Sequence, residues 1–364
     1  MSSCKIIPVA ALLLSFPLYY SCTTPAVRAA AASIEAIPIQ DQAVQFIRND
    51  AEQKVDVLID GKHFTSYIYS DDLKKPVLYP IKSANDNFIT RGFPLENRPF
   101  ERTDHPHHVG LWLNYGNVNG LDFWNNSNAI AEDKQERYGS ILHRDIVLME
   151  DGQTQGQLAV TADWVDSRGN RLLKEDTRYI FMGSEDERII DRITRLTAPN
   201  VDVSFDDNKE GMLGLRVSRE LEHPSDKAER YTDTQGRKAE HPTVNKEGIN
   251  GRYHGSNSIS GEEVWGTRAE WMTLSGEIKG EKITVAIFDH PKNIGYPTYW
   301  HARGYGLFAA NPLGQKALSG GKEELNFQLR AGESVAFRHR IIIYSDQEVK
   351  DAQIDRDFKE FTSR

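Results

Sequence analysis

A histidine-rich segment carries the densest set of groups that could do chemistry. Residues 104–112 read DHPHHVGLW and place three imidazoles, His105, His107 and His108, directly after Asp104. Because proline biases the residue before it towards an extended backbone, we expect a strand with His105 and His107 on one face and His108 on the other. Such a pair could clamp a divalent metal, contact a sugar or transfer protons, or it could simply hydrogen-bond the backbone.

A second cluster lies almost two hundred positions further along, between residues 288 and 306. Its polar and aromatic members include Asp289, His290, Trp300, His301, Arg303 and Tyr305. Aromatic faces beside hydrogen-bonding groups suit a pyranose ring, whereas the alternative is an aromatic core strand with polar ends. We expect the two histidine-bearing segments to meet in one pocket, because separately buried imidazoles would each need a hydrogen-bond partner.

A third set combines Glu210 and Arg216 with Arg268. Glu210 and Arg216 could be an acid/base group and a carboxylate anchor, or they could form a structural ion pair. A hydrolase would need two carboxylates facing each other across the sugar, for which Glu210 with Asp104 or Asp289 is the available pairing.

Proton abstraction beside a carboxylate needs a base, a cation for the developing enolate and an acid for the leaving oxygen. We expect His107 or His301 as base, Arg268 or Arg303 as clamp, and Tyr305 or His108 as acid. The full catalytic set is His105, His107, His108, His301, Tyr305 and Glu210, and the substrate-binding set is Arg216, Arg268, Arg303, Trp112, Trp300, Asp289 and His290. The carboxylate completing a metal site cannot be chosen from the sequence, so a divalent metal stays one alternative.

Short runs of alternating apolar and polar residues, bounded by Gly, Asp and Asn, indicate antiparallel strands. They span residues 55–60, 63–69, 158–165, 178–182, 188–196, 283–288, 325–329 and 334–344. The expected fold is all-β, a large antiparallel β-sandwich over residues 41–364 with a terminal helix at 346–361. Ser345 and Glu348 would open that helix as a capping box. The polar segment 222–261 is a candidate lid, rim or disordered insertion.

The N-terminus predicts export. Lys5, a short apolar stretch and Cys22 form a lipoprotein signal over residues 1–22, followed by a tether at 23–40; a plain secretory signal cleaved near 29–32 is the alternative. Cys4 and Cys22 are the only cysteines in the sequence, so a chain beginning at lipidated Cys22 has no other thiol for disulfides or catalysis. We expect a lipid-anchored protein of the periplasm, the outer membrane or the cell surface.

Composition excludes several classes of protein. The 364 residues have a mean hydropathy of -0.56, which excludes a polytopic membrane protein, and a formal net charge of -9 without an evident basic face. Nucleic-acid binding would need such a face. An oligosaccharide is the expected partner, and the lipid anchor the expected membrane contact.

Three motifs, DHPHHVGLW (104–112), WGTRAEW (265–271) and YWHARGYGL (299–307), resemble the exported bacterial family labelled "methane oxygenase PmoA-like". Val109 departs from that family's pattern, which often has Arg there. The label does not imply a true methane monooxygenase, since no apolar run of about eighteen residues follows the signal. The resemblance implies a soluble sandwich similar to galactose mutarotase, encoded near polysaccharide-degradation genes, with some relatives acting as dehydratases on oligosaccharides containing uronic acids.

The leading hypothesis is therefore an exported carbohydrate-active enzyme that performs an elimination, as an oligosaccharide dehydratase or lyase. A non-catalytic sugar-binding lipoprotein, a sugar epimerase and a glycoside hydrolase remain the alternatives. An enzyme should gather His105, His107 and His301 with an Arg in one pocket, whereas a binding platform should present Trp and Tyr flat on an open surface.

Overall fold

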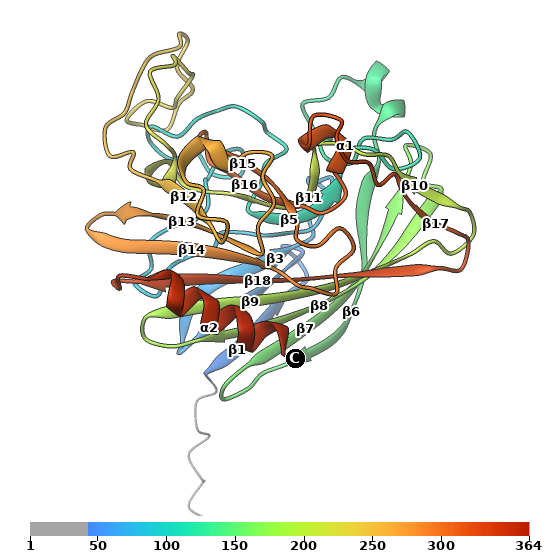
Figure 1. Cartoon of the computed structure of the whole chain (residues 1–364), viewed down its shortest axis with the longest axis horizontal. Coiled ribbons are helices and arrows are strands. Elements are labelled where there is room, and N and C mark those ends of the chain that lie inside the picture. The colour runs from blue at the N-terminus through green and yellow to red at the C-terminus, as the bar shows by residue number, and fades with distance from the viewer. Residues whose placement is uncertain (1–42, 364) are drawn as a thin grey trace, which may run out of the picture. The chain divides into compact units, whose positions relative to one another are not determined.

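Two eight-stranded antiparallel sheets pack face to face in the computed structural model, which describes residues 43–363 (Figure 1). The first sheet has the order β1 (Val44–Asn49), β2 (Lys54–Ile59), β3 (Lys62–Ile68), β4 (Val77–Leu78), β5 (Leu111–Tyr115), β11 (Gly211–Arg216), β16 (Leu307–Asn311) and β15 (Tyr299–Arg303). The second has the order β12 (Arg252–Gly255), β13 (Trp271–Ile278), β14 (Glu281–Asp289), β18 (Ser334–Ser345), β9 (Glu187–Thr197), β8 (Arg171–Gly183), β7 (Gly156–Val165) and β6 (Ser140–Glu150). A short pair joins β10 (Val203–Phe205) to β17 (Phe327–Leu329).

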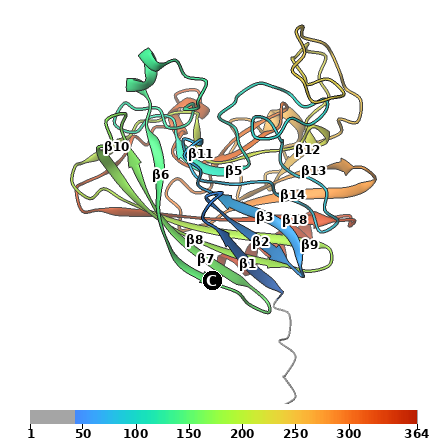
Figure 2. The ribbon, with the colours of Figure 1, turned by 180° about the vertical axis from the view of Figure 1, so that it is seen from behind.

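The main hydrophobic core lies between the two sheets. In β14, Ile287 belongs to this core and the next residue, Phe288, points to the opposite face. In β5, Leu113 belongs to the core and Trp112 points away from it. Each such buried apolar side chain stabilises the fold by roughly 1.5–3 kcal/mol. Viewed from behind, β1 to β3 lie against the strands of the second sheet (Figure 2).

The C-terminal helix α2 (Asp351–Thr362) covers the outer face of the second sheet (Figure 1). Its buried side chains Ile354, Phe358 and Phe361 form a second apolar cluster with the outward residues of β13, β14 and β18. The other helical segments are short: 3₁₀ turns at Glu132–Arg137, Arg219–Leu221 and Gly261–Val264, and α1 (Gln315–Leu318).

The expected capping box of the terminal helix is wrong. Ser345 is the last residue of β18, where it pairs with Ile283 and its Oγ accepts a hydrogen bond from the Ala84 backbone N–H at 3.2 Å. The helix begins several residues later, and its N-cap residue Lys350 makes no side-chain capping bond. Strand pairing and packing of the apolar face, rather than a local cap, therefore set the start of this helix.

The all-β sandwich with a C-terminal helix is confirmed, and each of the alternating runs contains a strand. Segment 222–261 holds β12 but otherwise little regular structure, and isolated bridges join Glu229 to Thr243 and Tyr231 to Arg102. The expected signal, Cys22 and tether lie outside the described residues, so export and lipid anchoring stay predictions. Within residues 43–363 no helix is long and apolar enough to cross a membrane.

Candidate functional site

Strand register places several polar side chains on the outer face of the first sheet. Pairing across β5, β11, β16 and β15 aligns Trp112, Gly214, Ala309 and His301 in one row. The neighbouring row aligns Arg216, Leu307 and Arg303. Their sequence neighbours lie in the core between the sheets, so these rows face away from it. A Cβ on Gly214 would lie 2.5 Å from the Trp112 ring, so the glycine is needed for this indole to cross β11.

The histidine segment is a turn above this face. The His108 backbone N–H donates to the His105 carbonyl at 3.0 Å, and His105 has a φ of 42°. The rings of His105 and His108 consequently stack, with centroids 4.8 Å apart and planes 2° apart, while His107 is perpendicular to His108 at 4.4 Å. The expected strand with His105 and His107 on one face is therefore wrong, because the backbone reverses around Pro106.

Asp104 is the ionic centre of the site. Its Oδ1 accepts hydrogen bonds from Arg91 and Arg216, each at 2.6 Å, and both arginine side chains are fully buried. Its Oδ2 lies 2.9 Å from His105 Nδ1. Burial alone would raise the pKa of Asp104, but Arg216, His105 and Arg91 together hold it well below its usual range. Asp104 is therefore a permanent carboxylate at neutral pH.

Tyr305 joins the two histidine-bearing segments. Its ring stacks on His105 with centroids 4.9 Å apart, and the Arg216 guanidinium lies 5.0 Å from the Tyr305 ring centre. Burial raises the pKa of Tyr305 to about 12. The Asp104 carboxylate contacts Nδ1 of His105, and no hydrogen bond within residues 43–363 engages Nε2 of this side chain, which is 38% exposed. A carboxylate that orients an imidazole while its other nitrogen stays available is an arrangement suited to general acid/base chemistry.

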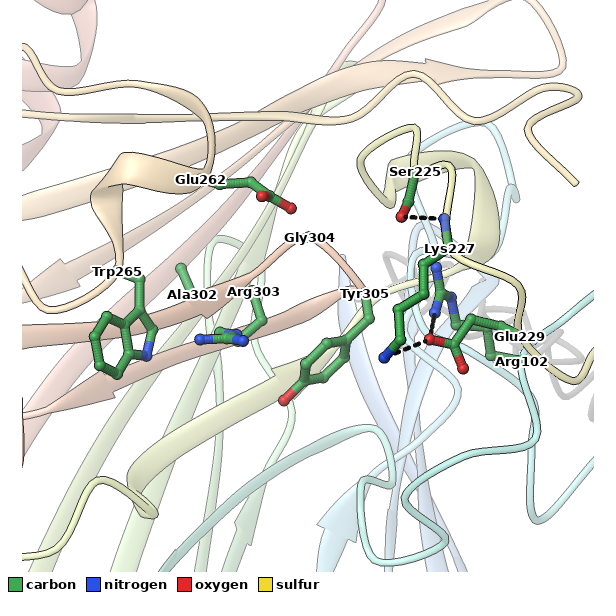
Figure 3. A pocket seen from close by; sticks show the side chains of 10 residues that line it. All are labelled: Arg102, Ser225, Lys227, Glu229, Glu262, Trp265, Ala302, Arg303, Gly304 and Tyr305. Carbon is green, nitrogen blue, oxygen red and sulfur yellow. Dashed lines mark hydrogen bonds and ion pairs between the residues drawn. The ribbon is translucent and has the colours of Figure 1, made fainter. Parts of the chain in front are cut away.

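A cavity of about 290 Å³ lies beside Tyr305 (Figure 3). It is lined by Arg102, Ser225, Lys227, Glu229, Glu262, Trp265, Ala302, Arg303, Gly304 and Tyr305. Figure 3 shows Tyr305 between the Trp265–Arg303 pair and the group formed by Arg102, Glu229 and Lys227. Polar segment 222–261 therefore supplies part of the wall of this cavity.

The cations of the cavity differ in how they are neutralised. Glu229 lies 3.2 Å from Arg102 and 3.1 Å from Lys227, so both of these cations have a counter-ion. Arg303 instead lies over the Trp265 ring at 5.5 Å, and no carboxylate of residues 43–363 lies within ion-pair distance of it. Trp265 is 36% exposed. Arg303 is thus an exposed cation on an aromatic face, available to an anionic ligand.

Several residues predicted to be catalytic instead make contacts within the protein. His301 is buried on the sheet face, with Nδ1 2.7 Å from the Lys209 carbonyl oxygen, and burial lowers its pKa to about 4. Glu210 lies 3.7 Å from His301 and pairs with Lys209, not with Arg216. Neither His301 nor Glu210 lines the cavity beside Tyr305.

The remaining predicted binding residues also pair within the protein. Arg268 donates to the carbonyls of residues 295 and 297 and to Glu323, and Trp300 is buried with Nε1 donating to the Ala269 carbonyl. Trp112 is fully buried under His108, and Arg216 is held by Asp104. Trp112, Trp300 and Arg216 are therefore buried, and Arg268, whose side chain is 26% exposed, is held by Glu323.

Asp289 and His290 lie on the second sheet. Asp289 is fully buried at the end of β14, where it accepts hydrogen bonds from the Asn293 side chain and the Thr298 backbone, and His290 packs against Phe361 of α2. Burial raises the pKa of Asp289 to about 7. With Asp104 held by arginines and Asp289 enclosed in the other sheet, the expected hydrolase pairings with Glu210 are not supported by the geometry.

The predicted catalytic and binding sets did not contain Arg91, Arg102, Lys227, Glu229 or Trp265, although Trp265 lies in one of the three motifs. The histidine-rich segment 104–112 indicated Asp104, but no local pattern indicates which arginine neutralises it. Within residues 43–363, no group of three His, Cys, Asp or Glu side chains could hold a metal ion. The geometry therefore gives no support to the divalent-metal alternative.

Comparisons with known proteins assign the chain to a family. A search of curated proteins finds no match. Among solved structures, the GH36 α-galactosidase AgaB from Geobacillus stearothermophilus is similar, with a TM-score of 0.40, 9% identity and coverage of 83% of this chain and 41% of the other. Galactose 1-epimerase from Lactobacillus acidophilus has a TM-score of 0.36, 9% identity and coverage of 84% of this chain and 100% of its own. The chain spans about two fifths of the length of the α-galactosidase.

The matching family model corrects the expected resemblance. It covers residues 54–359 and is described as a family of unknown function, DUF6807, rather than as a PmoA-like family. The similarity inferred from the three motifs is therefore wrong as a family assignment, although those motifs supply Asp104, Trp265 and Arg303 to the site. The chain belongs to the DUF6807 family.

Proposed function

We propose that this protein binds an acidic sugar in the cavity beside Tyr305 and catalyses an elimination on it, with His105 as the base. The observation that carries the proposal is the juxtaposition of an unpaired Arg303 on Trp265 with the Asp104–His105 pair stacked on Tyr305. Arg303 and Trp265 can recognise a carboxylate on a sugar ring, and His105 can accept a proton.

Recognition follows from the aromatic and cationic walls. The exposed indole of Trp265 can stack on the C–H face of a pyranose, and Arg303 can donate bidentate hydrogen bonds to a carboxylate. A volume of about 290 Å³ is near the lower end of small-molecule sites, which favours a single sugar ring inside with the rest of an oligosaccharide outside. A uronic-acid residue combines these features in one ligand.

The chemistry requires a proton to leave the carbon next to the carboxylate. His105 Nε2 takes this proton, Arg303 stabilises the negative charge that develops on the carboxylate, and the bond from the β-carbon to the leaving oxygen breaks to form a carbon–carbon double bond. Tyr305, protonated at neutral pH, gives its proton to the leaving oxygen. His105 is not itself a lining residue but stacks on Tyr305, which lines the cavity. It replaces the expected bases His107, which lines a different cavity, and His301, which is buried against the Lys209 carbonyl.

The test follows absorbance of the new conjugated double bond in purified protein supplied with oligosaccharides that contain uronic acids. His105→Asn should lower the rate by about 10²- to 10⁴-fold. Asparagine suits the positive φ of this position, so the turn should be kept.

His254→Asn is a matched control, since His254 is also partly exposed and lies 3.2 Å from a carboxylate, that of Asp351, on the other sheet. Its rate should stay at the wild-type level. Binding of the acidic oligosaccharide without any double-bond formation would overturn the elimination and favour the sugar-binding alternative.

A further inference from the structure

A second, larger cavity lies on the other side of the histidine turn. Its volume is about 450 Å³, and none of its lining residues also lines the cavity beside Tyr305. The walls come from residues 72–77, 94–95, 106–109 and 126–129, so four separate segments enclose it. The histidine turn connects it to the described site, since His107 lines this cavity and His105 stacks on Tyr305.

The amine of Lys75 lies at this cavity and has no counter-ion among the described residues. The residue is 5% exposed, and its Nζ donates a hydrogen bond to the His107 carbonyl at 2.7 Å. No carboxylate of the described residues lies within ion-pair distance, and the Trp112 ring centre is 5.3 Å from Nζ. Buried lysines are almost always paired, because an ammonium loses its hydration on burial. One hydrogen bond also leaves two of the three ammonium protons available.

His107 brings a second free polar atom. Its side chain is about nine-tenths buried, and Nε2 has no hydrogen-bond partner. Burial, followed by the charge of Lys75, lowers the pKa of His107 to about 2, so the ring is neutral and can donate one N–H. Leaving such an atom unsatisfied costs about 1–3 kcal/mol, a cost that a ligand oxygen would remove.

The rest of the wall has apolar residues, including Val77, Pro94, Pro106 and Val109, together with the charged Asp72 and Lys74 and three polar residues at 126–128. Leu95, which is 42% exposed, also lines the cavity. The charges of Asp72 and Lys74 offset each other, so the cavity has one net positive charge, from Lys75, beside the neutral donor His107. This matches a singly charged acid group, whereas a phosphate dianion would leave one negative charge uncompensated. We infer that this cavity is a second binding site, for a small organic carboxylate with an apolar body, whose oxygens accept hydrogen bonds from Lys75 Nζ and His107 Nε2.

The inference is independent of the proposed sugar chemistry and can be tested with hexanoate by calorimetry at about pH 6. Hexanoate should bind the wild-type protein, and hexylamine and 1-hexanol should bind at least about tenfold more weakly. Lys75→Met removes the ammonium while keeping the length of the side chain, and should lower the affinity for hexanoate at least about tenfold.

Ala129→Trp is the second variant, because Ala129 is an exposed lining residue where a large ring should block the cavity without disturbing the core. It should also abolish hexanoate binding, and Arg303→Met in the other cavity should leave it unchanged. The site would be overturned by equal affinity for hexanoate and 1-hexanol, by unchanged binding in Lys75→Met or Ala129→Trp, or by loss of binding in Arg303→Met.

Discussion

Asp104 has the largest number of roles of any residue in the site. It neutralises two buried guanidinium groups, Arg91 and Arg216, and it also contacts the ring nitrogen of His105. The like charge of Arg216 adds to burial in lowering the pKa of Arg91, to about 9, which shows how closely the two cations lie. Asp104 therefore both stabilises the fold and orients the proposed base.

Asp104→Asn should lower the free energy of unfolding by about 3–5 kcal/mol, because it leaves two buried cations without their carboxylate. Urea denaturation followed by fluorescence measures the change. Asp163→Asn is the control, since Asp163 also pairs with two arginines, Arg144 and Arg171, whose side chains are 49% and 42% exposed. That variant should lose less than about 1 kcal/mol. Equal losses of unfolding free energy in the two variants would show that Asp104 and its buried arginines stabilise the fold no more than an exposed ion pair does.

At the scale of single residues, the sequence indicated which side chains could do chemistry but not how they lie relative to one another. The Asp-His-Pro triplet drew attention to Asp104 and His105, yet the rule for residues before proline predicted extended backbone where His105 has a positive φ. Arg91 and Arg102 lie in a segment without regular structure, so no periodicity could indicate that they reach Asp104 and the cavity. Long-range pairing of this kind is set by the tertiary fold.

The elements of the two sheets differ in how clearly the sequence predicts them. Strands such as β8 alternate between buried and exposed residues, so their period of two is visible in the sequence. The central strands β5, β11 and β16 are buried on both faces, since loops cover their outer side, and their sequences do not alternate. The predicted residues Trp112 and Arg216 lie on these strands, whereas the missed residues Arg91, Arg102, Lys227 and Glu229 lie outside every named strand, which is why the expected fold was right and the site incomplete.

Helix α2 is held by packing rather than by an N-terminal cap. Phe358→Ala should therefore lower the free energy of unfolding by about 3–5 kcal/mol, because the ring packs edge-on against Phe288 at 5.6 Å. Guanidinium denaturation gives the value, with Phe100→Ala as a control at an exposed aromatic residue. A loss below about 1 kcal/mol for Phe358→Ala would mean that the helix is only loosely attached to the second sheet.

At the scale of the whole molecule, buried titratable groups link stability to pH. Burial raises the pKa of Glu222 to about 7 and lowers the pKa of Lys75 to about 7. The raised pKa of Glu222 stabilises the folded state below its ordinary pKa, and this contribution is lost as pH rises towards 7. Lys75 has the opposite effect, since the unfolded chain binds its proton more tightly than the folded one.

Lys75 should therefore make the folded protein more stable as pH rises from about 7 to about 10, the ordinary range of a lysine. Lys75→Met should flatten this rise, and thermal unfolding across the interval measures it. Lys174→Met, at an exposed lysine paired with Asp176, is the control that should keep the wild-type slope. An unchanged slope in Lys75→Met would contradict this, because it would mean that the folded and unfolded states bind the proton of Lys75 equally tightly.

At this scale the alternation of apolar and polar residues correctly predicted a β-sandwich, whereas the absence of a nucleic-acid partner, inferred from charge, stays a prediction. The sequence could not indicate that segment 222–261 helps to enclose a cavity, because a polar sequence is equally typical of a rim and of a disordered insertion. Lys227 and Glu229 of this segment become part of the cavity only where it lies against Arg102 and the end of β15.

The measurement that tests the central claim most directly is calorimetric binding of an oligogalacturonate and of its neutral galactose counterpart to wild-type protein and Arg303→Met. The wild-type protein should prefer the acidic ligand, and Arg303→Met should lose at least about tenfold in its affinity, about 1.4 kcal/mol. Arg195→Met, at an exposed arginine of the second sheet, should bind as wild type does. Equal affinity of the wild-type protein for both ligands, or unchanged binding of the acidic one to Arg303→Met, would contradict the account.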